Sequence, residues 1–109
     1  MKVKDMGKLI RTKLEGKIKQ KQPNAKFSVL DRQDLVSELD KKLLEEVTEF
    51  LAASSTEHRN EELADILEVL KTYFSLNIFD QELIEQVQTE KFKERGGFTE
   101  GIYYESEYQ

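Results

Sequence analysis

The sequence predicts an all-α fold, a compact helical domain that contains a pair of long helices. Apolar residues recur every three or four positions in three separate segments, which is the spacing that lines one side of an α-helix. Aspartates able to cap a helix start precede the first and the third of these segments. Charged residues make up 36% of the chain and hydrophobic residues 38%, values that are ordinary for a soluble helical protein.

The first helical segment runs from about residue 34 to residue 53. Its apolar residues fall on one stripe, which comprises Leu35, Leu39, Leu43, Val47 and Phe50. Asp31 or Asp34 can cap its start, because a short side-chain oxygen accepts hydrogen bonds from the free N–H groups of a first turn. The run Ser54-Ser55-Thr56 breaks the pattern and ends the helix.

Two further helices are predicted after this break. The second begins near Glu57 or Asn60 and ends at Leu76, and Asn77 suits its end because asparagine tolerates left-handed backbone geometry. Its inward-facing residues are Leu63, Ile66, Leu67, Leu70, Tyr73 and Phe74. The third follows Asp80 as its cap and stops at Gly96-Gly97. Its apolar residues are Leu83, Ile84, Val87 and Phe92.

The two ends of the chain carry weaker patterns. Residues 1 to about 25 are basic and hold enough apolar residues for one short amphipathic helix. Residues 26–30 alternate apolar and polar side chains, which is compatible with a short strand, and a second short strand is possible in the tail from residue 98 to residue 109. With 109 residues in all, the chain has room for a single domain spanning 1–109.

Composition excludes several classes of function. A formal net charge of −5 argues against a partner that is a nucleic-acid polymer, because such binding relies on positive charge. The chain has no cysteine, so disulfides and thiolate metal sites are excluded. No stretch approaches the roughly 20 apolar residues of a membrane span, and the first residues lack the apolar run of a signal peptide. We therefore expect a cytoplasmic protein without a membrane partner.

Four acidic residues fall within the apolar stripes or at their edges rather than on the open faces of their helices. At about 100° per residue, Glu46 falls between Leu35 and Leu39 on the first helix, and Glu49 lies one step outside that stripe. On the second helix Glu62 falls inside the apolar arc and Asp65 lies at its edge. Each helix thus contributes an i, i+3 pair of carboxylates, and such residues are neighbours on a helix surface.

Converging carboxylates predict a divalent metal. Burying them together without a counter-charge would cost several kcal/mol for each group. Oxygen-only ligands favour Mg²⁺, with Mn²⁺ as a possible substitute. A di-iron bundle would need a Glu-x-x-His pair, and the only histidine, His58, follows Ser55 instead, so we treat it as an ordinary surface residue. The predicted metal ligands are Glu46, Glu49, Glu62 and Asp65.

The same acidic residues match a known family signature. Glu45-Glu46-Val47-Thr48-Glu49, followed after twelve residues by Glu62-Leu63-Ala64-Asp65, resembles the Glu-Glu-x-x-Glu … Glu-x-x-Asp signature of the MazG-like all-α nucleotide pyrophosphohydrolases. Residues 8–14, Lys-Leu-Ile-Arg-Thr-Lys-Leu, are similar to the opening of the phosphoribosyl-ATP pyrophosphohydrolase-like branch. Residues 91–98, Lys-Phe-Lys-Glu-Arg-Gly-Gly-Phe, resemble its ending. The chain departs from that branch at Thr12, where Asp is usual, and at Gly16, which replaces the Pro-Glu region that often follows.

The resemblance implies hydrolysis of a nucleoside triphosphate between its α and β phosphates, giving a monophosphate and pyrophosphate. Glu45 or Glu49 would accept the proton of the attacking water, with Mg²⁺ on the four ligands. The basic residues expected to grip the triphosphate are Lys8, Arg11, Lys13, Lys91 and Arg95. Members of the family typically form helical dimers or tetramers, so the resemblance also implies a homodimer or homotetramer.

Two alternatives stay open at this point. One is hydrolysis of phosphoribosyl-ATP, an activity of the same chemical class. The other is a non-catalytic helical oligomerisation module, whose carboxylates would be solvated and whose apolar stripes would join subunits. Metal-dependent thermal stabilisation would distinguish the enzyme from the module, because a ligand that binds only the native state raises its stability.

Overall fold

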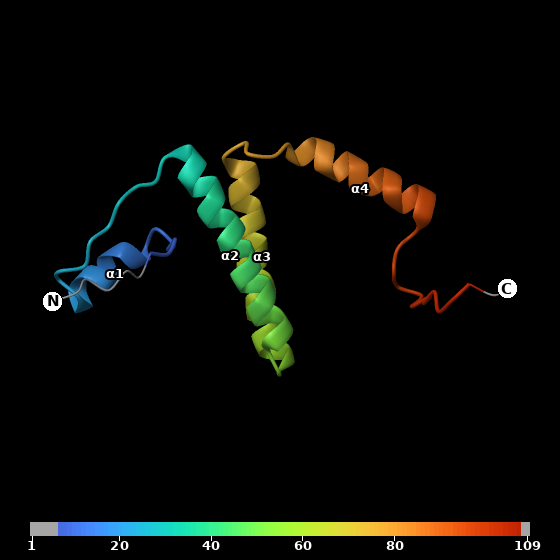
Figure 1. Ribbon diagram of the computed structural model, residues 1–109, viewed down its shortest axis with the longest axis horizontal. Helices are drawn as coiled ribbons and strands as arrows, with labels where there is room; N and C mark the ends of the chain where they lie inside the picture. Colours follow the sequence, from blue (N-terminus) through green and yellow to red (C-terminus); the bar gives the residue numbers. More distant parts are fainter. Residues whose placement is uncertain (1–6, 108–109) are drawn as a thin grey trace. The chain divides into compact units, whose positions relative to one another are not determined.

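The computed structural model of the chain describes residues 7–107. Within this range the protein has four α-helices and no strand, which confirms the all-α prediction (Figure 1). The helices are α1 (Leu14–Lys21), α2 (Arg32–Ala52), α3 (Thr56–Ser75) and α4 (Gln81–Arg95). The last three correspond to the three segments predicted from apolar spacing, and α1 is the short helix of the basic N-terminal region.

Side chains cap the three longer helices at their starts. The Asp31 carboxylate accepts a hydrogen bond from the backbone N–H of Asp34 at 2.8 Å, and Asp80 accepts from Leu83 at 3.1 Å. Ser55 caps α3 in the same way, where the sequence indicated only a break. Each cap satisfies one of the N–H groups that a first helical turn leaves without a partner. After α3, Asn77 takes a positive φ of 54°, as predicted for that position.

The two short strands considered for the ends of the chain do not form within residues 7–107. Residues 26–30 are irregular, and Val29 in this segment is 99% exposed. The tail that follows α4 is also irregular through residue 107. A strand needs a neighbouring strand to bond its backbone N–H and C=O groups, and alternating side chains alone do not provide one.

The structure divides into two compact units, Met1–Ile78 and Phe79–Gln109. The single domain expected from chain length stays a prediction. No helix within residues 7–107 has both the length and the apolar character needed to cross a membrane.

The first unit is organised around α2 and α3, which lie side by side as a helical hairpin (Figure 1). Its buried apolar core consists of Leu39, Val69 and Tyr73. Half-buried residues that pack against this core are Leu9, Leu35, Leu43, Phe74 and Ile78. The Tyr73 hydroxyl donates a hydrogen bond to Oδ1 of Asp40 at 2.6 Å, which links α3 to α2.

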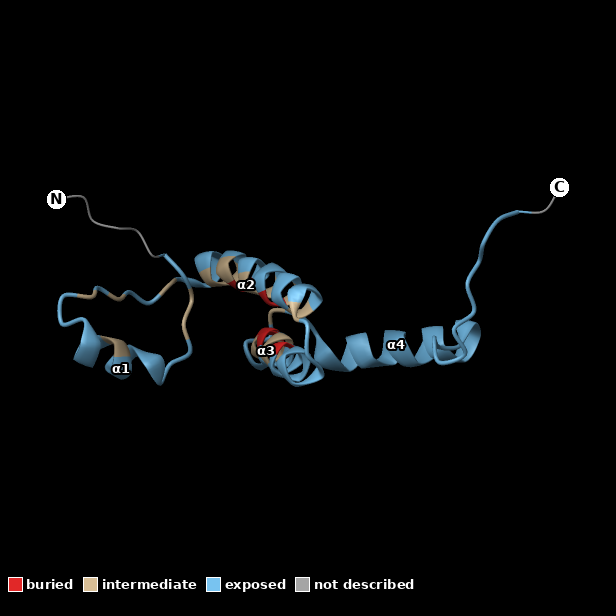
Figure 2. Cartoon of the chain, turned by 90° about the horizontal axis from the view of Figure 1, so that it is seen from below, coloured by how far each residue is buried: buried red, intermediate tan, exposed pale blue. Residues whose placement is uncertain are grey.

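The hairpin has two chemically different faces on either side of this core. At about 100° per residue, the exposed leucines of α2 and those of α3 lie on the same side of the line along which the two helices pack together. They form the leucine face, made of Leu44, Leu51, Leu63, Leu67 and Leu70. The prediction that Leu63, Leu67 and Leu70 face inward is therefore wrong, because the side of α3 that packs on α2 is centred on Val69 and Tyr73 instead. The opposite side, the acidic face, carries Lys42, Glu45, Glu49, Glu61, Asp65 and Glu68. Figure 2 shows the buried residues of α2 and α3 on the sides where the two helices face each other, and the leucines of the leucine face are exposed.

The second unit contains α4 and the irregular tail. All residues of α4 are exposed. Helix α4 ends where Gly96 adopts a φ of 78°, a conformation that side chains disfavour. The end of the helix and the following loop surround an open pocket of about 610 Å³. Its lining includes Phe92, Arg95, Phe98 and Tyr103.

Candidate metal centre

Two glutamates are buried in the interface between α2 and α3. Glu46 of α2 is 6% exposed and Glu62 of α3 is 7% exposed, values close to those of the apolar core residues. Both belong to the helix sides that the apolar periodicity predicted to face inward, so that prediction is confirmed. Glu45 and Glu49 are exposed and Asp65 is half-buried, in keeping with their positions outside the stripe or at its edge.

The acidic side chains gather into two overlapping groups of three. Within each group, one carboxylate oxygen from every residue lies within 4.8 Å of the others. One group joins the two helices through Glu46, Glu62 and Asp65, and the other lies on α2 with Glu45, Glu46 and Glu49. Glu46 belongs to both, so the four predicted metal ligands converge around it. Carboxylates at this spacing can hold a divalent cation.

The convergence changes the acidity of two carboxyl groups. Burial raises the pKa of Glu46 from 4.5 to about 7, and the nearby Glu62, Glu49 and Asp65 add to the rise, whereas Lys42 opposes it. Partial desolvation likewise raises the pKa of Glu49, and Glu62 and Glu45 contribute in the same direction. The cluster therefore carries more negative charge than its surroundings stabilise, which is a feature of cation-binding and catalytic sites.

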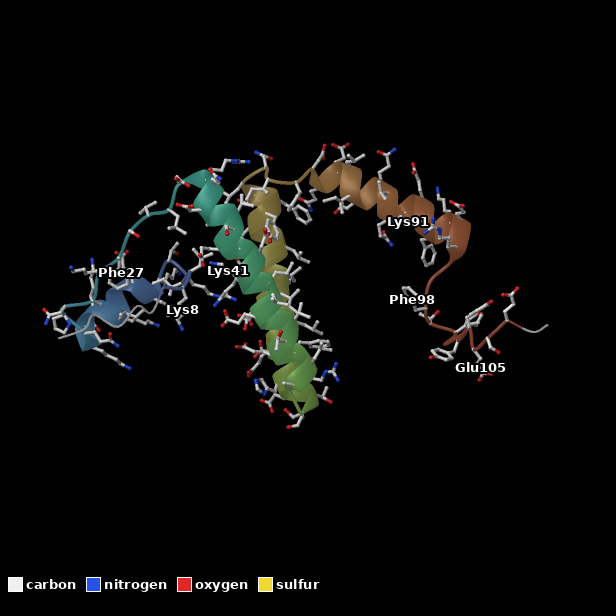
Figure 3. The ribbon with its side chains drawn as sticks, in the orientation of Figure 1. Lys8, Phe27, Lys41, Lys91, Phe98 and Glu105 are labelled. Carbon is white, nitrogen blue, oxygen red and sulfur yellow. The ribbon has the colours of Figure 1, made fainter. Side chains whose placement is uncertain are left out.

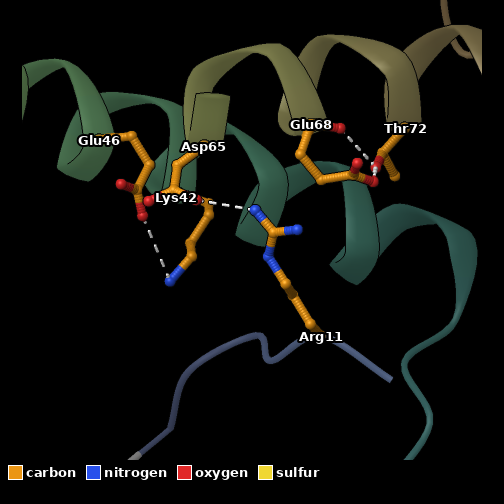
Figure 4. Close-up of polar contacts among 6 residues, drawn as sticks. All are labelled: Arg11, Lys42, Glu46, Asp65, Glu68 and Thr72. Carbon is orange, nitrogen blue, oxygen red and sulfur yellow. Dashed lines mark hydrogen bonds and ion pairs between the residues drawn. The ribbon is translucent and has the colours of Figure 1, made fainter. Parts of the chain in front are cut away.

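Three basic side chains contact the outer oxygens of the cluster. The Lys42 ammonium lies 3.7 Å from Oε1 of Glu46, and the His58 Nε2 lies 3.3 Å from Oε1 of Glu62. The Arg11 guanidinium donates a hydrogen bond to Oδ1 of Asp65 at 2.7 Å. Figure 4 shows Lys42 and Arg11 approaching the cluster from the same side, from different segments of the chain.

One oxygen of each buried glutamate is left without a hydrogen bond. Oε2 of Glu46 and Oε2 of Glu62 are buried and have no donor among residues 7–107. A buried polar atom without a partner costs about 1–3 kcal/mol, and more if it is charged. A divalent cation held by these oxygens would remove that cost. The donor set therefore fits Mg²⁺ or Mn²⁺, both of which prefer oxygen ligands.

The predicted phosphate-binding residues lie in both units. Lys8, Arg11 and Lys13 belong to the segment before α1, and only Arg11 forms an ion pair among the described residues. Lys91 and Arg95 project from α4 in the second unit, where Arg95 lines the open pocket. Figure 3 labels Lys8 and Lys91 and shows both as exposed side chains. Their role toward phosphate stays a prediction.

Two contacts of the cluster were missed from the sequence. His58 was interpreted as an ordinary surface residue, but its ring contacts the buried Glu62. Lys42 was not singled out, although it contacts both Glu45 and Glu46. A signal was present in each case, because Lys42 precedes Glu46 by four residues and His58 precedes Glu62 by four, a spacing that brings helical side chains together.

Comparison of the chain with protein-family models, with curated proteins and with solved structures found no match. The functional assignment of the cluster therefore depends on its own residues and their geometry.

Proposed function

We propose that this protein is a Mg²⁺-dependent nucleoside triphosphate pyrophosphohydrolase of the MazG-like kind. The observation that carries the proposal is the buried pair Glu46 and Glu62, each with one oxygen that has no donor among residues 7–107. Both glutamates occupy ligand positions of the motif that resembles that family. Buried carboxylates are expensive to keep without a counter-charge, so their presence in a small core favours a cation-dependent role.

The ligands of the cation would be Glu46, Glu62 and Asp65, joined by Glu49 from the adjacent group. When bound, Mg²⁺ would polarise a phosphate oxygen and lower the pKa of a bound water. Lys42 and His58 would hold the outer oxygens of Glu46 and Glu62, which fixes the orientation of these carboxylates.

The proton of the attacking water would pass to a carboxylate on the acidic face. Hydrolysis adds water across the bond between the α and β phosphates, so one water proton must leave as pyrophosphate is released. Glu45 is suited to accept it, because it is exposed on α2 in the same group of three and is not one of the proposed cation ligands. Glu49 is the second candidate, for a cation that leaves its carboxylate uncoordinated.

The phosphate chain needs positive charge in addition to the cation. Arg11 already lies at the cluster, and Lys8 and Lys13 lie within a few residues of it in the sequence. We propose that these three residues bind the triphosphate beside the cluster, and, as a separate proposal, that Lys91 and Arg95 of the second unit contact phosphate oxygens of a nucleotide. Arginine is favoured for this task because its planar fork matches two phosphate oxygens.

A second candidate function is a helical oligomerisation module. The leucine face favours it, since Leu44 and Leu51 are each 69% exposed on a hairpin with a small core. The two functions are compatible, because the leucine face and the acidic face lie on opposite sides of the hairpin. A homodimer or homotetramer joined through leucines would leave the carboxylates accessible.

The decisive experiment is a screen of nucleoside triphosphates and phosphoribosyl-ATP with Mg²⁺, in which pyrophosphate and orthophosphate are assayed separately. We expect pyrophosphate and the nucleoside monophosphate in a one-to-one ratio. Stepwise release of orthophosphate through a diphosphate would indicate a different phosphohydrolase. Cleavage of phosphoribosyl-ATP alone would select the other enzymatic alternative, and no turnover of any nucleotide would favour the module.

A further inference from the structure

Arg11 reaches the acidic cluster from a distant part of the sequence. It lies 54 residues before its partner, and its Nη2 is 2.7 Å from Oδ1 of Asp65. The contact is shorter than the ion pairs of Lys42 and His58 with the same cluster. It also differs in kind, because Lys42 and His58 each share a helix with the glutamate they contact, whereas Arg11 belongs to the segment before α1.

Packing of the N-terminal segment explains how Arg11 arrives there. Leu9, two residues earlier, packs against the core formed by Leu39, Val69 and Tyr73. This anchor places the segment on the hairpin, and the Arg11 side chain then reaches Asp65 on the acidic face (Figure 4). Leucine packing therefore positions the segment, while one ion pair, that with Asp65, holds the arginine head group among residues 7–107.

The ion pair is suited to being exchanged. The side chains of Arg11 and Asp65 are 59% and 41% exposed, so water screens their attraction and can replace either partner. Only one nitrogen of the guanidinium is engaged with Asp65, which leaves other N–H donors of its fork available. A phosphate group offers a guanidinium two oxygens and a larger negative charge than one carboxylate.

We propose that Arg11 couples cation binding to substrate binding. Without substrate, Arg11 neutralises Asp65 and so lowers the affinity of the cluster for a cation. When a triphosphate arrives, Arg11 turns to a phosphate oxygen, and Asp65 becomes available as a full ligand. This inference rests on the proposed function, because it assumes that Asp65 belongs to a cation site and that the substrate carries phosphate.

The coupling has two measurable consequences. Removal of the Arg11 charge should tighten cation binding in the absence of nucleotide, because a positive charge next to the ligands repels a second one. It should also reduce the factor by which each ligand, the cation or the nucleotide, raises the affinity of the protein for the other. Thermodynamic linkage requires this factor to be the same in both directions. A residue that only stabilised the fold would change neither quantity in this pattern.

The test measures Mn²⁺ binding to the full chain by calorimetry, alone and with an α,β-methylene nucleoside triphosphate that cannot be cleaved. The variants are Arg11→Ala, Arg11→Gln and Arg11→Lys. Lys17→Ala is the matched control, because it removes one positive charge from exposed α1 and Lys17 takes part in no ion pair among residues 7–107. Circular dichroism checks that every variant keeps its helices.

Arg11→Ala and Arg11→Gln should bind Mn²⁺ alone about five- to tenfold more tightly than wild type. Both should lose most of the gain in Mn²⁺ affinity that the nucleotide gives to wild type. Arg11→Lys should lie between, and Lys17→Ala should match wild type. Equal or weaker Mn²⁺ binding by Arg11→Ala, or an unchanged nucleotide gain, would overturn the coupling but not the metal site. Absence of Mn²⁺ binding from wild type and variants alike would overturn both.

Discussion

Glu46 of α2 and Glu62 of α3 meet across the interface of the hairpin, and neither is more than 7% exposed. Each contributes one oxygen to a contact with a basic residue on its own helix and keeps a second, buried oxygen without a donor among residues 7–107. Two like-charged groups in this arrangement oppose folding unless a proton or a cation lies with them.

Glu62→Gln should abolish Mg²⁺-dependent hydrolysis while leaving the metal-free fold as stable as wild type, or more stable by about 1 kcal/mol. The substitution keeps the shape of the side chain and removes the charge that repels Glu46. Urea unfolding with a chelator and turnover with Mg²⁺ measure the two effects. Glu61→Gln is the matched control, because Glu61 is its exposed neighbour on α3. A Glu62→Gln protein with wild-type turnover would show that the catalytic site lies elsewhere.

The chelated protein should lose stability as the pH rises from about 4.5 to about 7, the interval bounded by the unfolded and folded pKa of Glu46. Because the pKa of Glu46 is higher in the native state than in the unfolded state, the native state binds the proton more tightly. The contribution of protonated Glu46 to stability is therefore complete below pH 4.5 and lost above pH 7. The loss should be about 3 kcal/mol. Unfolding free energies measured across this range test it.

Mg²⁺ should reverse this dependence, since it binds the deprotonated carboxylates and stabilises the native state at neutral pH. Glu46→Gln should flatten the slope in the chelated protein and remove most of the stabilisation by Mg²⁺. A metal-free stability that rises between pH 4.5 and pH 7 would contradict the raised pKa of Glu46.

Tyr73→Phe should destabilise the first unit by about 1–2 kcal/mol, because it removes the hydrogen bond from the buried hydroxyl to Asp40. Burial and the Asp40 carboxylate raise the pKa of Tyr73 to about 12. The stabilisation is therefore complete below about pH 10 and is lost as the pH rises through 12. Thermal unfolding at neutral pH measures the loss. Tyr103→Phe, at an exposed position in the tail, should change little.

Arg95→Ala should reduce kcat/KM by an amount equivalent to about 2–3 kcal/mol if Arg95 binds phosphate in a site that excludes water. Arg95→Lys should recover only part of this, because a point charge does not reproduce a bidentate fork. Mg²⁺ binding by the free protein should stay nearly unchanged in both. If Arg95 instead only complements the end of α4, lysine should replace it fully and kcat/KM should barely move.

The sequence by itself determined the helices, but only part of the sides they bury, because Leu63, Leu67 and Leu70 were expected to face inward and are exposed. A helix forms its hydrogen bonds within a few residues, so apolar spacing and short capping side chains suffice to predict it. The same periodicity placed Glu46 and Glu62 among buried residues, although both are charged. Asn77 with its positive φ was likewise readable from the residue type alone. The possible strands at residues 26–30 and in the tail were wrong, because alternation says nothing about whether a partner strand exists.

Only the tertiary structure decided which groups meet. A helical wheel drawn for α2 or α3 alone does not show which carboxylates of α3 lie beside Glu46. That depends on how the two helices pack against each other. The contact between Arg11 and Asp65 is further beyond prediction, since it depends on Leu9 packing on a core formed more than 25 residues away. Local periodicity specifies the face that a side chain occupies, whereas its partner across the interface is set by long-range packing.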